Sequence, residues 1–86
     1  LRTNPRQKRA HETVSIAMEA TAQLLERGDH GEVTTNHVAE RAGFSVGTLY
    51  RYFSGKASIF EAMVTAEMAR QEARIAADLA DPGLDT

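Results

Sequence analysis

The sequence predicts an all-α domain, in which three helices form a bundle with a helix-turn-helix and a longer fourth helix follows. Two long segments repeat apolar residues every three or four positions, which is the spacing of one face of a helix. A short glycine-containing segment separates two further, short helical segments. No stretch alternates apolar and polar residues over a useful length, so β-strands are not expected. The chain has 86 residues, 42% of them hydrophobic, which is enough for one small domain.

The first helix is expected over residues 6–27. Pro5 suits the start of a helix, because the N–H that proline lacks would have no partner in the first turn. Gly28 can end the helix by adopting a left-handed backbone conformation at no steric cost. Residues 29–32 are then expected to form a loop. The inward stripe of this helix consists of Val14, Ala17, Met18, Thr21, Leu24 and Leu25.

Two short helices follow, joined by three residues. Thr34 or Thr35 can cap the first of them, because a hydroxyl there accepts a hydrogen bond from a free N–H of the first turn. This helix ends at Gly43, and Ser45 can cap a second helix over residues 46–53. A short turn with a glycine between two short helices is typical of a helix-turn-helix. The side chains expected to point inward are Val38, Ala39, Ala42, Phe44, Leu49 and Phe53.

A longer fourth helix is expected to follow Ser54, which can cap its N-terminus. Asp-Pro-Gly at residues 81–83 ends it. The helix is longer than a small bundle needs, so its distal half is expected to connect to a part of the protein that this chain lacks. Its apolar stripe is dense at first and sparse later: Ile59, Phe60, Met63, Val64, Met68, Ile75 and Leu79.

Charge is distributed unevenly along the chain. Residues 1–56 hold eight Lys and Arg and six Asp and Glu, a net charge of +2, whereas residues 57–86 hold two and six, a net charge of −4. This asymmetry indicates that the first part of the chain faces an anionic partner. We divide the chain into a basic N-terminal arm, a helix-turn-helix domain, and a connecting helix with a linker: residues 1–5, 6–56 and 57–86.

Several classes of function are disfavoured by what the sequence lacks. Because the chain has no cysteine, it has no disulfide framework, thiolate nucleophile or Cys-rich zinc site. His11, His30 and His37 do not have metal-ligand spacing. The sequence contains no nucleophile elbow, Gly-rich phosphate loop or paired carboxylates. We therefore expect no enzyme, a small hydrolase included, and no metal or cofactor.

The chain is expected to act in the cytoplasm. No apolar run reaches the roughly 18–20 residues of a membrane-spanning helix. Residues 1–9 are basic and lack the apolar stretch of a secretion signal. Since the chain begins with Leu1 rather than a start methionine, we expect it to be a fragment of a longer protein.

Residues 34–56 read TTNHVAERAGFSVGTLYRYFSGK. This segment closely resembles the DNA-binding segment of the TetR family of bacterial transcriptional repressors, whose pattern includes A-x-x-A-G-V-S-x-G-T-L-Y-x-Y-F-x-S-K. The chain departs from the family at Val38, Phe44 and Gly55, and none of these changes removes a key group. The resemblance implies a homeodomain-like arrangement of three helices. The residues that agree are Thr35, Ala39, Ala42, Gly43, Ser45, Gly47, Thr48, Leu49, Tyr50, Tyr52, Phe53 and Lys56.

The helix expected over residues 46–53 has the pattern that a DNA-reading helix needs. Such a helix presents small and polar side chains to the base edges and keeps apolar side chains on its other face. Gly47 allows close approach to DNA, Thr48 can contact a phosphate or a thymine methyl group, and Arg51 can bind guanine through two hydrogen bonds.

Residues on both sides of this helix are expected to hold the DNA phosphates. The N-termini of the second and fourth helices present free N–H groups, so Thr35 and Lys56 can clamp phosphates. Tyr50 and Tyr52 offer hydroxyls to phosphates, and the resemblance places Asn36 where family members reach bases. The predicted DNA-contacting residues are Thr35, Asn36, Ser45, Val46, Gly47, Thr48, Tyr50, Arg51, Tyr52 and Lys56.

Each of these residues also has a simpler role open to it. The Thr and Ser residues can serve only as caps, and Arg51 alone is typical of a solvated surface charge. Tyr50 can be partly buried, with only its hydroxyl free. An alternative function is a protein-interaction module that docks a partner through Tyr50, Tyr52 and Val46. The basic residues near the N-terminus are expected to form a disordered, solvated end that adds non-specific affinity near DNA, with a specific reader of bases as the alternative: Arg2, Arg6, Lys8 and Arg9.

The resemblance also implies how the whole protein works. Family members are homodimers whose two recognition helices enter successive major grooves of a pseudo-palindromic operator. A larger C-terminal helical domain, which this chain lacks, forms the dimer interface and holds a pocket for a small-molecule inducer. Because the inducer releases such proteins from their operators, we expect a bacterial transcriptional repressor.

Overall fold

The described part of the chain is entirely helical apart from turns and connections. The computed structural model describes residues 4–28, 31 and 33–80. These residues confirm the predicted all-α class and the predicted number of helices. The helices are α1 (Pro5–Glu26), α2 (Thr35–Ala42), α3 (Val46–Tyr50) and α4 (Lys56–Ala80).

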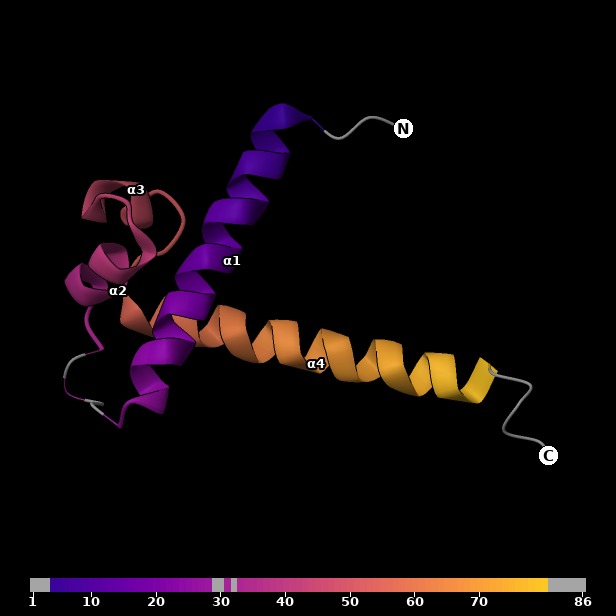
Figure 1. Ribbon diagram of the computed structural model, residues 1–86. Coiled ribbons are helices and arrows are strands. Elements are labelled where there is room, and N and C mark those ends of the chain that lie inside the picture. The colour runs from indigo at the N-terminus through magenta and orange to yellow at the C-terminus, as the bar shows by residue number, and fades with distance from the viewer. Residues whose placement is uncertain (1–3, 29–30, 32, 81–86) are drawn as a thin grey trace.

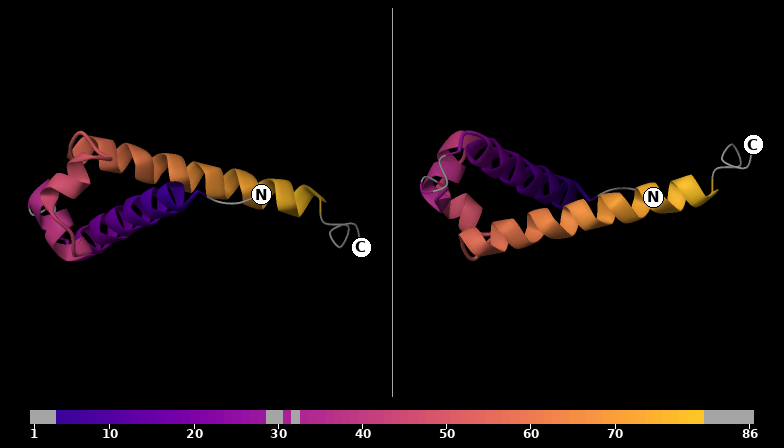
Figure 2. Two further views of the ribbon diagram at one scale, coloured as in Figure 1. Left: turned by 90° about the horizontal axis from the view of Figure 1, so that it is seen from above. Right: turned by 90° about the horizontal axis from the view of Figure 1, so that it is seen from below.

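Helices α1 and α4 cross, and the two short helices lie together at one end of the domain (Figure 1). α1 packs against α2 and α4, and α2 packs against α3. The last turns of α4 extend well beyond the rest of the bundle (Figure 2). None of the described helices combines the length and the apolar character that crossing a membrane requires.

The ends of α1 lie within one residue of the predicted bounds. The Asn4 side chain accepts a hydrogen bond from the Arg6 N–H at 2.9 Å, and Pro5 is the first helical residue. Gly28 adopts the predicted left-handed conformation, with φ +81°. The expectation of a disordered basic end is wrong for three of its members, which lie within α1 and are exposed: Arg6, Lys8 and Arg9. Arg2 lies outside the described residues, as does most of the expected loop.

The caps predicted for α2 and α3 are confirmed, but α3 is shorter than predicted. Thr34, rather than Thr35, caps α2 by accepting from the His37 N–H at 3.1 Å. α3 ends at Tyr50, not at residue 53. Beyond it, two successive N–H groups, those of residues 52 and 53, both donate to the Leu49 carbonyl oxygen at 3.0 Å. Sharing one carbonyl tightens the last turn and ends the regular helix.

Ser54 does not occupy the cap position of α4, so that prediction is wrong. The helix begins at Lys56, and the carbonyl oxygen of Gly55 accepts from the N–H groups of Ser58 and Ile59, at 3.1 and 3.3 Å. Gly55 is thus the residue that precedes the first turn. The predicted end of α4 at residues 81–83 lies outside the described residues.

The core lies where α1, α2, α3 and the first turns of α4 meet. Most of the predicted inward residues are buried there, and the sequence pattern missed Ala20 and Val33. Thr21 is the buried polar residue of this core, and its hydroxyl donates to the Ala17 carbonyl oxygen at 2.8 Å, which satisfies it. The buried apolar residues are Ala17, Ala20, Leu24, Val33, Val38, Ala39, Leu49, Phe53 and Ile59.

Candidate nucleic-acid interface

The turn between α2 and α3 is held by hydrogen bonds at both of its ends. Gly43 ends α2 with φ +89°, a conformation that favours glycine. The N–H groups of Gly43 and Phe44 both donate to the Ala39 carbonyl oxygen, at 2.9 and 3.2 Å. Ser45 then caps α3, because its hydroxyl oxygen accepts from the Thr48 N–H at 3.1 Å. These bonds fix the direction in which α3 leaves α2.

The buried side of α3 determines which residues face outward. Leu49 is completely buried. Because successive helical residues are rotated by about 100°, residues two before and two after Leu49 lie on the opposite side of the helix. These residues are Gly47 and Arg51, and both are exposed. Arg51 keeps helical backbone angles (φ −69°, ψ −26°), so the geometry holds to this position. We call Gly47 and Arg51 the outward stripe of α3.

Nothing within the described chain requires a glycine at position 47. Its φ is not positive, and an added Cβ would meet only the Ser45 hydroxyl oxygen, at an ordinary 3.8 Å. Glycine inside a helix costs about 0.8–1 kcal/mol relative to alanine. A glycine at position 47 therefore does not help the domain to fold. Because it has no side chain, another molecule can approach the outer surface of α3 closely.

Two pairs of hydroxyl groups flank the outward stripe. Ser45 Oγ and Thr48 Oγ1 lie 2.9 Å apart, and Thr35 Oγ1 lies 2.9 Å from the Tyr50 hydroxyl oxygen. The second pair joins the start of α2 to the end of α3. Tyr50 is 51% exposed and therefore partly buried, as one alternative expected, but its hydroxyl is paired with Thr35 rather than free. In each pair one hydroxyl donates to the other, which leaves one proton for an outside acceptor.

The charge around α3 favours an anionic partner. Residues 41–60 include three cations and no Asp or Glu. Arg41 is used within the fold, since its Nε donates to Gln23 Oε1 on α1 at 2.7 Å, a contact that the sequence analysis did not anticipate. Arg51 and Lys56 form no ion pair with any described residue. Lys56 stands at the N-terminus of α4, where the helix dipole is positive and a cation does not stabilise the helix.

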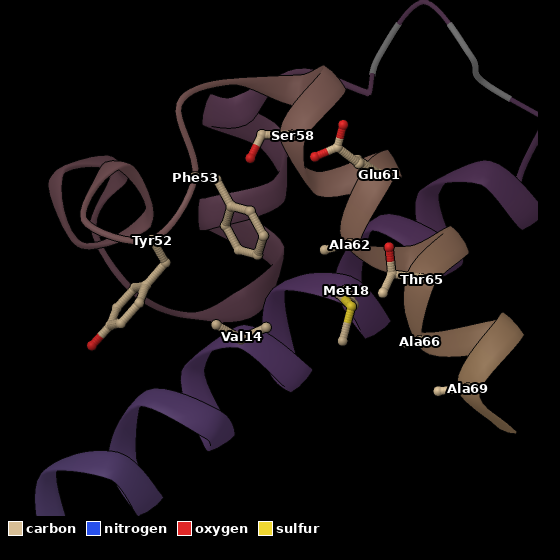
Figure 3. Close-up of a pocket in the computed structure, with 10 residues that line it drawn as sticks. All are labelled: Val14, Met18, Tyr52, Phe53, Ser58, Glu61, Ala62, Thr65, Ala66 and Ala69. Carbon is tan, nitrogen blue, oxygen red and sulfur yellow. The ribbon is translucent and has the colours of Figure 1, made fainter. Parts of the chain in front are cut away.

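The other predicted contact residues differ in how much of their surface is exposed. Val46 packs partly against the core, so it presents less surface than expected. Tyr52 lies in the turn after α3 and points away from Phe53, which points between α1 and α4 (Figure 3). The predicted residues that are exposed are Asn36, Ser45, Gly47, Tyr50, Arg51, Tyr52 and Lys56. Those that are half-buried are Thr35, Val46 and Thr48.

A family model of bacterial regulatory proteins of the tetR family matches residues 17–63, more than half of the chain. The chain belongs to the TetR family. The match runs from the middle of α1 to the first turns of α4 and corresponds to the family's N-terminal DNA-binding domain. It therefore includes the whole helix-turn-helix and both flanking helix ends.

Curated relatives of this TetR-family chain match it over about half to two thirds of its length. The HTH-type transcriptional repressor KstR of Rhodococcus jostii is 39% identical over 57 residues, which are 66% of this chain and 27% of that protein. KstR of Mycobacterium tuberculosis is 35% identical over 57 residues, 66% of this chain and 26% of that protein. The nucleoid occlusion factor SlmA of a Marinomonas species is 38% identical over 47 residues, 55% of this chain and 24% of that protein.

The TetR-family chain thus spans about a quarter of the length of these curated relatives. No solved structure matches it.

Proposed function

We propose that this TetR-family domain binds double-stranded DNA in a sequence-specific way, with α3 in the major groove. The observation that carries the proposal is Gly47. It lies on the outward stripe of α3, its neighbourhood is open, and the fold itself gains nothing from a glycine there. Close approach of this surface to the edges of base pairs would explain why position 47 is a glycine.

The phosphates on the two sides of the groove are assigned to groups that flank α3. The Thr35 and Tyr50 hydroxyls, 2.9 Å apart, share one remaining proton that can be donated to a phosphate oxygen near the start of α2. Lys56 combines a positive charge with the N-terminus of α4, where backbone N–H groups favour an anion. The Tyr52 hydroxyl, exposed in the turn between α3 and α4, can also donate to a DNA phosphate.

For the whole protein, we propose a bacterial transcriptional repressor that acts as a cytoplasmic homodimer on a pseudo-palindromic operator. A small-molecule inducer would bind in a C-terminal domain and release the operator. Membership of the TetR family supports this proposal, and two of the relatives named above are repressors by name. The distal half of α4 also suits a connection to another domain, because it exposes Met68, Ile75 and Leu79.

Selection from a random-sequence duplex pool tests the proposal. The full-length parent protein is mixed with the pool at about 50 and about 200 mM salt, and bound duplexes are sequenced. We expect an enriched inverted repeat, with half-sites about one helical turn or more apart, whose affinity falls steeply with salt.

The matched control is Arg74→Ala, which removes one exposed cation from the distal part of α4 and should leave the selected motif unchanged. If the folded parent protein enriches no sequence and its binding does not depend on salt, the proposal is overturned. The exposed tyrosines of α3 and its following turn would then be tested as a docking site for a protein partner.

A further inference from the structure

We infer that Arg51 is the main specificity-determining side chain of this domain and that it reads guanine in a G·C pair of each half-site. The inference rests on the proposed DNA binding and adds which residue distinguishes bases and which base it prefers. It follows from which side chains around α3 already form hydrogen bonds or pack against the core within the domain.

Most other side chains of α3 are engaged or unsuited to reading one base. The Ser45 and Thr48 hydroxyls are paired with each other at 2.9 Å, and Tyr50 is paired with Thr35 at the same distance. A hydroxyl can donate or accept, so it discriminates poorly between bases in any case. Val46 packs partly against the core, and Gly47 has no side chain. Arg51 is the remaining position on the helix and its end, and it has no ion-pair partner among the described residues.

The outward stripe gives the Arg51 guanidinium an open path along the helix. A helical side chain leans towards the N-terminus and covers the turn that precedes it. For Arg51 that turn carries Gly47, and only the Ser45 hydroxyl lies within 4 Å of where a Cβ would stand. The guanidinium can therefore lie flat over the backbone of α3 and reach the part of the groove that the N-terminal half of the helix faces.

The direction of the stripe favours a base over a phosphate. Arg51 lies opposite the fully buried Leu49, so its side chain leaves α3 on the side turned away from the core, which is the side that would face the base pairs in a groove. The candidate phosphate contacts, Thr35 and Lys56, lie at the two flanking helix ends. Guanine presents two acceptors, N7 and O6, at a spacing that matches the two donors of a guanidinium. Adenine presents one acceptor and one donor there, and a guanidinium has no acceptor.

The test compares base preference at every position of the selected operator. Wild-type parent protein, Arg51→Ala and Lys56→Gln are titrated against the operator and against duplexes with single base-pair replacements. We expect one G·C position per half-site at which wild type loses about 5- to 150-fold in affinity. With Arg51→Ala this ratio should fall to near 1, while preferences at other positions remain. Lys56→Gln should weaken all duplexes alike and keep the ratio.

The result that overturns the inference is an Arg51→Ala protein that binds every duplex more weakly by the same factor and keeps its guanine preference. Arg51 would then be a phosphate contact. Because the residue is exposed, its replacement should not unfold the domain, and a thermal melt of each variant checks this. Failure of the proposed function looks different, since wild type would then select no motif at all.

Discussion

Two exposed parts of this domain, α3 and the distal half of α4, differ in what they expose. α3 buries its apolar Leu49 completely and turns a glycine and an arginine outward. Every residue from 67 to 80 of α4 is exposed, and the apolar ones are no exception. Met68 and Ile75 are 56% and 59% exposed, and Leu79 is 82% exposed. The outward stripe of α3 carries a glycine and a cation, whereas the distal half of α4 leaves apolar side chains in water.

Residues are exposed for two different physical reasons in this domain. α3 has only five residues, too few to be stable alone, and it persists because Ser45 caps it and the core holds Leu49. No residue from 67 to 80 of α4 is buried or half-buried. The stability of this segment therefore rests on helix length, on good helix formers such as alanine, and on a weak Arg70–Glu67 ion pair at 3.4 Å. The first surface is therefore shaped for a polar ligand, whereas the second suits an apolar contact with another domain.

The largest difference is expected when one leucine is truncated in α3 and one in the distal half of α4. Leu49→Ala should lower the free energy of unfolding by about 2–5 kcal/mol, because it leaves a cavity in a small core. Leu79→Ala should change it by less than about 0.5 kcal/mol in this domain, since the side chain is exposed. Urea denaturation followed by circular dichroism measures both. Equal losses would mean that the distal helix is as tightly packed as the core.

A smaller effect is expected at the helix caps. Thr34→Ala should destabilise the domain by about 1 kcal/mol, because the His37 N–H loses its acceptor at the start of α2. Ser54→Ala should have little effect, since Gly55 occupies the cap position of α4. The same denaturation experiment distinguishes them. A loss at Ser54 as large as that at Thr34 would contradict the assigned start of α4.

A third comparison removes one cation from each region. Lys56→Gln should weaken binding to all DNA sequences and reduce the slope of log affinity against log salt concentration by about 1. Arg74→Gln, on the exposed distal part of α4, should leave the slope unchanged. Fluorescence anisotropy with a labelled operator at several salt concentrations gives both slopes. Identical slopes for the two variants and wild type would remove Lys56 from the proposed interface.

The sequence predicted the elements that have a local signal. Gly43 and Ser45 mark the turn between α2 and α3, and both adopt the predicted roles. The end of α3 has no such signal. It depends on two N–H groups sharing the Leu49 carbonyl oxygen while Phe53 is drawn into the core, and this is a property of the packed bundle. The predicted helix consequently ran three residues too far.

The candidate site was predictable in outline but not in its internal bonds. Helical spacing alone places Gly47 and Arg51 on one side of α3 and Leu49 on the other. The Thr35–Tyr50 pair joins residues 15 apart, and the Arg41–Gln23 bond joins residues 18 apart. Such contacts depend on how the helices are positioned relative to one another, which spacing within one helix does not specify.

The most direct test of the proposed interface is Gly47→Ala, measured for both stability and DNA affinity. Alanine has open space at this position and is favoured in a helix, so the free energy of unfolding should stay the same or rise by up to about 1 kcal/mol. If α3 approaches base pairs closely at Gly47, affinity for the selected operator should fall by at least about tenfold, or about 1.4 kcal/mol. A folded Gly47→Ala protein that binds its operator as tightly as wild type would contradict the placement of this face against DNA.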